Sequence, residues 1–156
     1  MLYPCPKPIK EEKKARRYLR PIRKGFRAAL EIECNRIWGD IVLLRCNYRC
    51  QHVDETGFRC RSIAVDPHHI IRRVFKAIKF NIHNGMGICR YHHELGTTRL
   101  FLVAVRVFGE IAINKLKEMA QGEAPTEEDL VKIKQELTVV REKIKKEGYH
   151  EEKNNQ

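Results

Sequence analysis

The sequence predicts an α+β fold, with a small central core between helical N- and C-terminal extensions. Residues 22–37 and the region after residue 99 repeat apolar side chains at helical spacing, whereas residues 41–66 lack that spacing and contain turn-forming residues. We therefore expect three segments: a basic, partly helical N-terminal extension (1–40), the core (41–98) and a C-terminal helical extension (99–156).

The N-terminal extension is expected to begin as extended backbone and to continue as helix. Three prolines in residues 1–10 predict extended backbone, and residues 11–20 have the composition of a basic helix. In the helix expected after them, Phe26, Leu30 and Ile37 are the positions that we expect to face inward.

The core and the C-terminal extension contain shorter elements. Residues 62–67 and Gly85 to Cys89 are typical of strands, and a helix is expected from Arg90 to Leu95. A further helix is expected from Leu100 to Ala120, with a break at Gly109. Thr126 is placed to cap the last helix. The apolar stripe of that helix is expected to pack on the core rather than to form a dimer seam: Leu130, Ile133, Leu137, Val140 and Ile144.

The chain of 156 residues has a net charge of +11, which predicts an anionic partner, with nucleic acid as the first candidate. The charge is uneven. Residues 1–30 contain ten Lys and Arg against two Glu, whereas residues 121–156 contain seven against nine acidic residues. The acidic C-terminal part is therefore not expected to contact a nucleic acid.

The sequence shows no secretory signal, because the first 25 residues are rich in Lys and Arg and contain no apolar stretch. The longest apolar run, Leu100 to Val105, is too short to span a bilayer. We expect a soluble, cytoplasmic protein with no membrane partner. In that reducing compartment, six cysteines favour metal ligands or buried thiols over disulfides.

Four Cys and His residues have the paired spacing of a structural zinc site. Cys50 and Cys60 flank a turn, and Cys89 and His92 are separated by two residues at the start of a helix. Tetrahedral zinc sites commonly take two such local pairs. Cys46 is the alternative partner of Cys50, which would leave Cys60 as a buried thiol. The turn signal between Cys50 and Cys60 favours the first pairing.

A second cluster surrounds a pair of adjacent histidines. Neighbouring residues on a strand point to opposite faces, so one of His68 and His69 can bind a metal while the other faces a water molecule. His93 follows His92 on a helix, and the two side chains diverge by about 100°. We therefore expect a catalytic metal site beside the structural zinc site. His52 and His83 are expected to be solvated loop residues.

These residues carry a family resemblance. The stretch from Val65 to Arg72 (Val-Asp-Pro-His-His-Ile-Ile-Arg), followed by Asn84 to His93 (Asn-Gly-Met-Gly-Ile-Cys-Arg-Tyr-His-His), resembles the zinc-containing HNH endonucleases. Residue types, order and spacing match over residues 46–98. The basic N-terminal segment and the helices after residue 98 are similar, more weakly, to small HNH proteins of phages and mobile elements.

The resemblance implies a ββα-metal fold, in which a β-hairpin and a helix hold one divalent cation. It implies that His68 and His93 bind this catalytic ion, Mg²⁺ or Mn²⁺, and that His69 is the general base. Asn84 would brace the loop that holds the base or assist at the metal. Asp66 is expected at most to position a metal-binding side chain, and not to bind the metal itself. The chemistry suits these roles, since a cation offsets the phosphate charge and a neutral imidazole accepts a proton at neutral pH.

The loop after the histidine pair is predicted to contact DNA, and the resemblance implies that one of its first two arginines lies near the scissile phosphate. Phosphate contacts from this loop and from the basic N-terminal segment would give salt-sensitive binding without sequence preference. The basic residues of the loop are Arg72, Arg73, Lys76 and Lys79.

The leading prediction is therefore a metal-dependent endonuclease that acts on double-stranded or branched DNA. Its rivals are a zinc-stabilised DNA-binding module without catalysis and a small zinc-ribbon protein. Neither rival requires all of His68, His69, Asn84 and His93, so these residues favour the nuclease. Cleavage of both strands would favour a homodimer. The sequence leaves the oligomeric state, the cleavage specificity and the biological task open.

Overall fold

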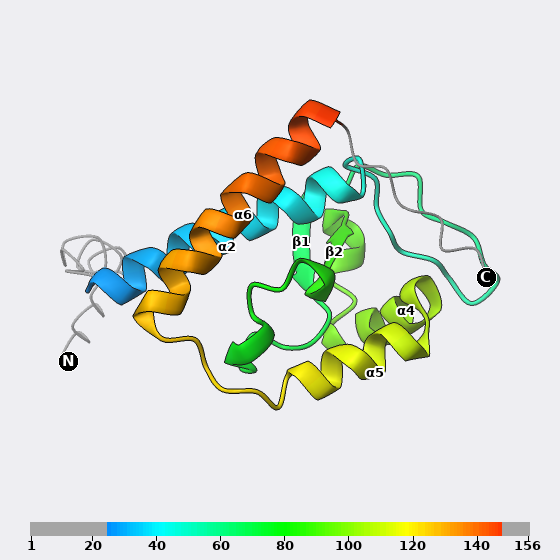
Figure 1. The fold of residues 1–156 in the computed structure, drawn as a ribbon. Coiled ribbons are helices and arrows are strands. Elements are labelled where there is room, and N and C mark those ends of the chain that lie inside the picture. The colour runs from blue at the N-terminus through cyan, green and yellow to red at the C-terminus, as the bar shows by residue number, and fades with distance from the viewer. Residues whose placement is uncertain (1–24, 148–156) are drawn as a thin grey trace, which may run out of the picture.

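The computed structural model describes residues 25–147, and the segments predicted over residues 1–20 lie outside this range. The described chain is α+β, with helices on both sides of one two-stranded antiparallel sheet (Figure 1). Its elements are α2 (Phe26–Arg45), β1 (Asp66–His69), the 3₁₀ helices η1 (Lys76–Ile78) and η2 (Ile82–Asn84), β2 (Gly85–Ile88), α3 (Arg90–His93), α4 (Thr97–Phe108), α5 (Glu110–Met119) and α6 (Glu127–Glu147).

Helix α2 is longer than the sequence predicts. The expected helix ends at residue 37, whereas α2 continues to Arg45. It stops where Asn47 and Tyr48 take positive φ angles of 50° and 54°. A right-handed helix cannot continue through this left-handed conformation, which costs free energy for residues other than glycine. The last two turns of α2 therefore occupy part of the segment that was expected to form strands.

Helix α6 packs along α2 (Figure 1). Leu30 and Ile37 of α2 are buried in this contact, as expected. Phe26 is wrong as an inward position, because it lies in the first turn of α2 with 66% of its surface exposed. The predicted α6 stripe packs within the fold, and its members all join the cluster around Trp38: Leu130, Ile133, Leu137, Val140 and Ile144.

Strands β1 and β2 form a short antiparallel ladder that runs from Asp66 opposite Ile88 to His69 opposite Gly85. The strand predicted near residue 85 is confirmed to within one residue, whereas the strand predicted over residues 62–67 begins only at Asp66. Gly85 brings the ladder against α2, because a Cβ atom there would overlap the Val42 side chain. The sheet, which carries the histidine pair, thus packs directly on α2.

Residues 46–65, here called the knuckle, form a loop with two arms. The strands expected in this region are wrong in detail, since the arms are joined only by two isolated bridges, Arg49 to Ile63 and Val53 to Arg59. The predicted turn is confirmed at the tip. There Asp54 Oδ1 accepts hydrogen bonds of 2.9 Å from the backbone N–H groups of Thr56 and Phe58. The side chain of Asp54 thus holds the turn in place of a strand ladder.

The helix expected from Leu100 to Ala120 consists of α4 and α5, broken at Gly109 as predicted. Gly109 has a φ of +82°, a conformation that favours glycine. Thr126 caps α6 as expected, because its Oγ1 accepts the backbone N–H of Asp129 at 3.2 Å. None of the described helices is long and apolar enough to cross a membrane. Helices α4 and α5 cover a second hydrophobic cluster, which includes Ile70, Met86, Ile88, Leu100, Val103 and Ile113.

Candidate functional site

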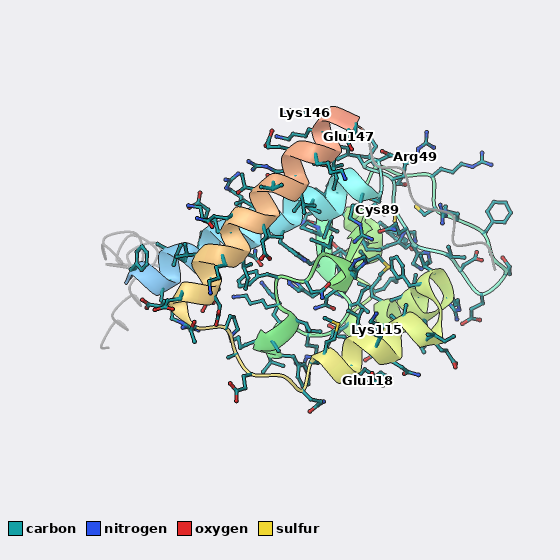
Figure 2. All side chains as sticks on the ribbon, in the orientation of Figure 1. Arg49, Cys89, Lys115, Glu118, Lys146 and Glu147 are labelled. Carbon is teal, nitrogen blue, oxygen red and sulfur yellow. The ribbon has the colours of Figure 1, made fainter. Side chains whose placement is uncertain are left out.

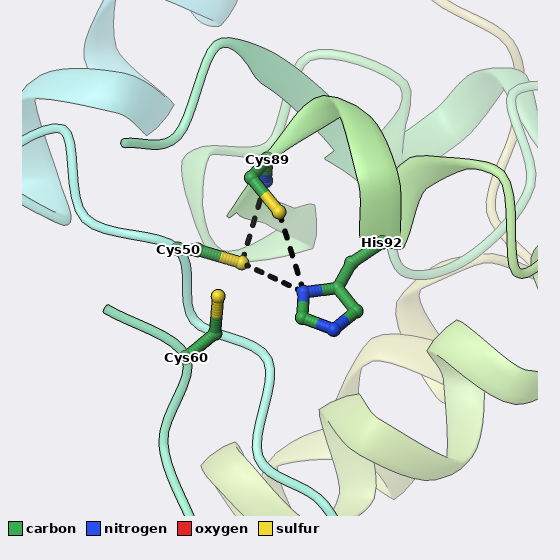
Figure 3. A group of neighbouring side chains, drawn as sticks. All are labelled: Cys50, Cys60, Cys89 and His92. Carbon is green, nitrogen blue, oxygen red and sulfur yellow. Dashed lines mark hydrogen bonds between the residues drawn. The ribbon is translucent and has the colours of Figure 1, made fainter. Parts of the chain in front are cut away.

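Four side chains converge beside α3 (Figure 3). Cys50 and Cys60 come from the two arms of the knuckle, Cys89 is the N-cap of α3, and His92 lies within that helix. Their ligand atoms all lie within 4.8 Å of one another. His92 Nδ1 is 3.3 Å from Cys89 Sγ and 3.6 Å from Cys50 Sγ. The four residues form a Cys3His cluster that could hold a metal ion.

The donor set fits zinc. A tetrahedral zinc ion with Zn–S bonds of about 2.3 Å separates its ligands by roughly 3.8 Å, which is comparable with the spacing in this cluster. Cys60 belongs to the cluster, as predicted. The alternative ligand, Cys46, does not, because its thiol donates to the backbone oxygen of Leu43 at 3.2 Å and packs against Gly87.

Neighbouring groups orient these four side chains. Cys50 Sγ accepts the backbone N–H of Cys89 at 3.3 Å, and Cys60 Sγ accepts that of Ser62 at 3.4 Å. The ring of His92 stacks on the ring of His52, with centroids 3.8 Å apart. His52 lies in a loop, as expected, but its half-buried ring is not simply solvated, because it packs on a member of the cluster. Sequence reasoning missed it because the stacking joins two segments that only the fold brings together.

His68 and His93 meet across a separate pocket. Their rings, from β1 and α3, lie edge to face with centroids 5.6 Å apart. Burial, reinforced by the nearby His93 and Arg73, lowers the pKa of His68 to about 4, so its imidazole is neutral at pH 7 and can bind a metal. The pocket has a volume of about 610 Å³ and is lined by Asn35, Trp38, Asp66, Pro67, His68, His69, Arg72, Arg73, Val74, His93, Gly96 and Thr97.

His69 is buried at the border of this pocket, with 9% of its surface exposed. Its ring stacks on Trp38 of α2 at a centroid distance of 3.8 Å, and its Nε2 lies 2.9 Å from the backbone oxygen of Lys79. Because a carbonyl oxygen only accepts, Nε2 carries the proton and Nδ1 is the free acceptor. Burial lowers the pKa of His69 to about 4, which keeps this tautomer neutral at pH 7. Trp38 is a neighbour of the site that the sequence did not reveal.

Asn84 is fully buried beneath the loop that joins the two strands. Its Oδ1 accepts the backbone N–H of Ile71 at 2.7 Å, while its Nδ2 donates to the backbone oxygens of Ile71 at 3.1 Å and Ile78 at 3.2 Å. Lys79, which holds His69 through its carbonyl, follows Ile78 directly. Asn84 is not among the residues that line the pocket. Its geometry favours the bracing role over direct contact with an ion in the pocket.

Two buried acceptor atoms beside the pocket have no hydrogen-bond partner among the described residues. They are Asn35 Oδ1 and Asp66 Oδ2, and both residues line the pocket. The other oxygen of Asp66 pairs with Arg90 at 3.4 Å. A buried acceptor without a partner is costly, so these atoms mark the pocket as a place that favours a hydrogen-bond donor or a cation.

The predicted DNA contacts differ in exposure. Arg72, Arg73 and Lys76 are exposed, and none of them forms an ion pair with an acidic side chain of residues 25–147. Lys79 is different, because its ammonium lies 2.7 Å from Glu31 Oε2 and only 13% of its side chain is exposed. Lys79 thus links the loop to α2, and its charge is paired with Glu31 rather than available to a phosphate.

No protein-family model matches the chain, and comparison with curated proteins and with solved structures finds no similar protein. The functional assignment therefore depends on the geometry of the two sites.

Proposed function

We propose that this protein is a metal-dependent DNA endonuclease of the HNH type, in which β1, β2 and α3 form a zinc-stabilised ββα-metal core. The observation that carries the proposal is the meeting of His68 and His93 across one pocket, with His69 buried at its border. Hydrolysis of a phosphodiester needs a cation site, a base and groups that hold the anion. This pocket offers a candidate for each.

His68 and His93 would hold one divalent cation, Mg²⁺ or Mn²⁺. When bound, the ion would offset the negative charge of the phosphate and stabilise the leaving 3′-oxygen. Asp66 supports a cation here, because its buried Oδ2 has no hydrogen-bond partner in the described chain and adds negative charge to the pocket. Carboxylate and water ligands suit both Mg²⁺ and Mn²⁺, and imidazole binds Mn²⁺ better than Mg²⁺, so both ions are expected to support cleavage.

His69 would act as the general base. A water molecule gives a proton to Nδ1 while its oxygen forms a bond to phosphorus. The bond from phosphorus to the 3′-oxygen breaks, and that oxygen takes a proton from solvent, which leaves a 5′-phosphate and a 3′-hydroxyl. The carbonyl of Lys79 and the ring of Trp38 would hold the imidazole in place during this transfer. A bound phosphate beside the ring would raise the low pKa of His69 toward neutrality.

The DNA backbone would be held by the basic residues around the pocket. Arg72 and Arg73 line it directly. A neighbouring hollow of about 740 Å³ shares Asn35 and Arg73 with the pocket and adds Lys76 to its lining. The two hollows thus adjoin each other, and Arg72, Arg73 and Lys76 offer positive charge to a phosphate backbone beside the histidines. Binding through such contacts weakens as salt is added, because counterions compete for the phosphates.

Plasmid nicking by His69→Ala tests the proposal. His83→Ala is the matched control, because His83 is an exposed histidine outside both clusters. With Mg²⁺ or Mn²⁺ added and zinc retained, we expect similar nicking by the wild type and His83→Ala. We expect nicking by His69→Ala to be at least about 100-fold slower, since it lacks the base. Equal rates for the two variants would contradict the role of His69. Salt-sensitive DNA binding without cleavage by any of the proteins would favour the non-catalytic module.

A further inference from the structure

Three arginines gather around a hollow on the knuckle. Arg49 lies on the arm that follows α2 (Figure 2), and Arg59 and Arg61 lie on the other arm. The hollow has a volume of about 330 Å³ and is lined by Arg49, Gly57, Phe58, Arg59, Cys60 and Arg61. None of these residues lines the histidine pocket. The hollow is therefore a separate basic site, and neither the zinc cluster nor the catalytic pocket accounts for its charge.

Acidic groups do not neutralise this site. Within residues 25–147, none of the three arginines forms an ion pair. The two acidic residues of the knuckle have other partners. Asp54 Oδ1 accepts three hydrogen bonds from the turn, and Glu55 pairs with Arg106 of α4 at 3.6 Å. A zinc ion bound by three thiolates and one neutral imidazole carries a single net negative charge, which leaves most of the positive charge available.

The apolar part of the surface identifies the kind of anion. Phe58 lies at the tip of the knuckle and Ile63 on its second arm, and each is 70% exposed. A small anion makes no use of exposed apolar side chains. A nucleic acid does, because sugars and base faces contact apolar groups while the phosphates contact guanidinium groups.

We propose that the knuckle is a second DNA-binding site, at which Arg49, Arg59 and Arg61 hold the phosphate backbone outside the point of cleavage. The identity of the ligand rests on the proposed endonuclease function, but binding at the knuckle requires no catalysis. Cys50 and Cys60, one on each arm, join the same metal cluster. The zinc ion would therefore also hold the arginines of the two arms in register with each other.

Fluorescence anisotropy with a labelled DNA duplex tests this site. The His69→Ala background without Mg²⁺ is used, so that binding is measured without cleavage. Arg59→Ala/Arg61→Ala removes two charges from the knuckle, and Lys132→Ala/Lys143→Ala removes two exposed charges from α6 as the matched control. We expect the arginine variant to bind about tenfold more weakly, and the slope of log affinity against log salt to become shallower by about 2. An affinity and slope equal to those of the control would overturn the proposal.

Zinc content shows whether each variant is folded. If Arg59→Ala/Arg61→Ala loses zinc, Arg49→Ala on the opposite arm takes its place, with an expected change in slope of about 0.9. An unchanged slope in a zinc-replete Arg49→Ala protein would then overturn the proposal. Weaker DNA binding by the knuckle variants, together with no cleavage by the wild-type protein, would support the knuckle site and contradict the endonuclease. Cleavage by the wild type, together with unchanged DNA affinity in the knuckle variants, would support the endonuclease and contradict the knuckle site.

Discussion

At the residue scale, Asn84 supports the histidine pocket without lining it. Its three hydrogen bonds close both ends of the loop that precedes Lys79. In Asn84→Ala, the backbone groups of Ile71 and Ile78 lose these partners in a buried environment. We expect the free energy of unfolding to fall by about 2–4 kcal/mol and cleavage to slow, because the carbonyl that holds His69 is no longer fixed.

Urea unfolding measures this effect. Asn114→Ala is the control, because Asn114 is exposed and the one hydrogen bond of its side chain within residues 25–147 is a surface contact with Lys117. Its stability is expected to stay within about 0.5 kcal/mol of the wild type. If Asn84→Ala were as stable as the control, the bracing role would be wrong.

The ion pair between Lys79 and Glu31 links the same loop to α2. The hydrogen bond from Lys79 lowers the pKa of Glu31 below its ordinary value of 4.5. The unfolded chain therefore binds this proton at a higher pH than the folded chain. The stabilisation is complete above pH 4.5 and is lost as the pH falls through the lower folded pKa.

Glu31→Gln tests this link by urea unfolding at a series of pH values. We expect it to lower the free energy of unfolding by about 0.5–1 kcal/mol at neutral pH, because the pair is partly exposed and screened by solvent. The difference from the wild type should disappear in acid. Glu136→Gln, at an exposed position of α6, should show no such pH dependence. If Glu31→Gln lowered the free energy of unfolding equally at all pH values, the stabilisation would not come from the charge of Glu31.

At the scale of elements, the Cys3His cluster joins the knuckle to α3 through ligands from both. Cys89→Ala removes a ligand at the N-terminus of α3. We expect it to lower the zinc content and to unfold the core, because metal binding and folding are coupled in small sites of this kind. Zinc analysis and circular dichroism measure the two effects.

Cys46→Ala is the matched control for that experiment. Cys46 is a partly buried thiol that lies outside the cluster, so its loss should leave the zinc content unchanged. A Cys89→Ala protein that is as stable and as rich in zinc as Cys46→Ala would rule out the structural role of the cluster.

Elements defined by local signals could be predicted from the sequence. Thr126 directly precedes the helix that it caps, and the members of the α6 stripe recur every three or four residues. Gly109 interrupts its helix through its own backbone conformation. The ligand pairs were predicted for the same reason, since each member is close to its partner in sequence. The end of α2 was not predicted. The apolar side chains beyond residue 37 face the sheet and α6, so tertiary packing lengthens the helix there.

Residues that act through tertiary contacts were beyond sequence reasoning. Trp38 reaches His69 from α2, and His52 reaches His92 from the knuckle. Lys79 was predicted as a phosphate contact because its charge is visible in the sequence, while its pairing with Glu31 is not. The sequence thus shows which side chains are charged or can bind a metal. Whether such a side chain is free to contact a partner depends on the fold.

At the scale of the whole molecule, the sheet lies between two hydrophobic clusters. One lies between α2 and α6, and the other lies beneath α4 and α5. β1 and α3 meet between them, which places His68 and His93 on different elements that packing holds together. The net charge of +11 over the whole chain favours an anionic partner. The Cys3His cluster and the proposed catalytic cation have different roles: the cluster would support the fold through a bound zinc ion, and the cation would take part in the reaction.

Plasmid nicking by the zinc-replete protein, with Mg²⁺ or Mn²⁺ added or withheld, tests this account most directly. We predict nicking by the wild type only when the second metal is added, at constant zinc content. We predict that His93→Ala, which lacks one proposed ligand of that metal, nicks at least about 100-fold more slowly. Nicking that is independent of added metal, or a His93→Ala protein as active as the wild type, would contradict the account.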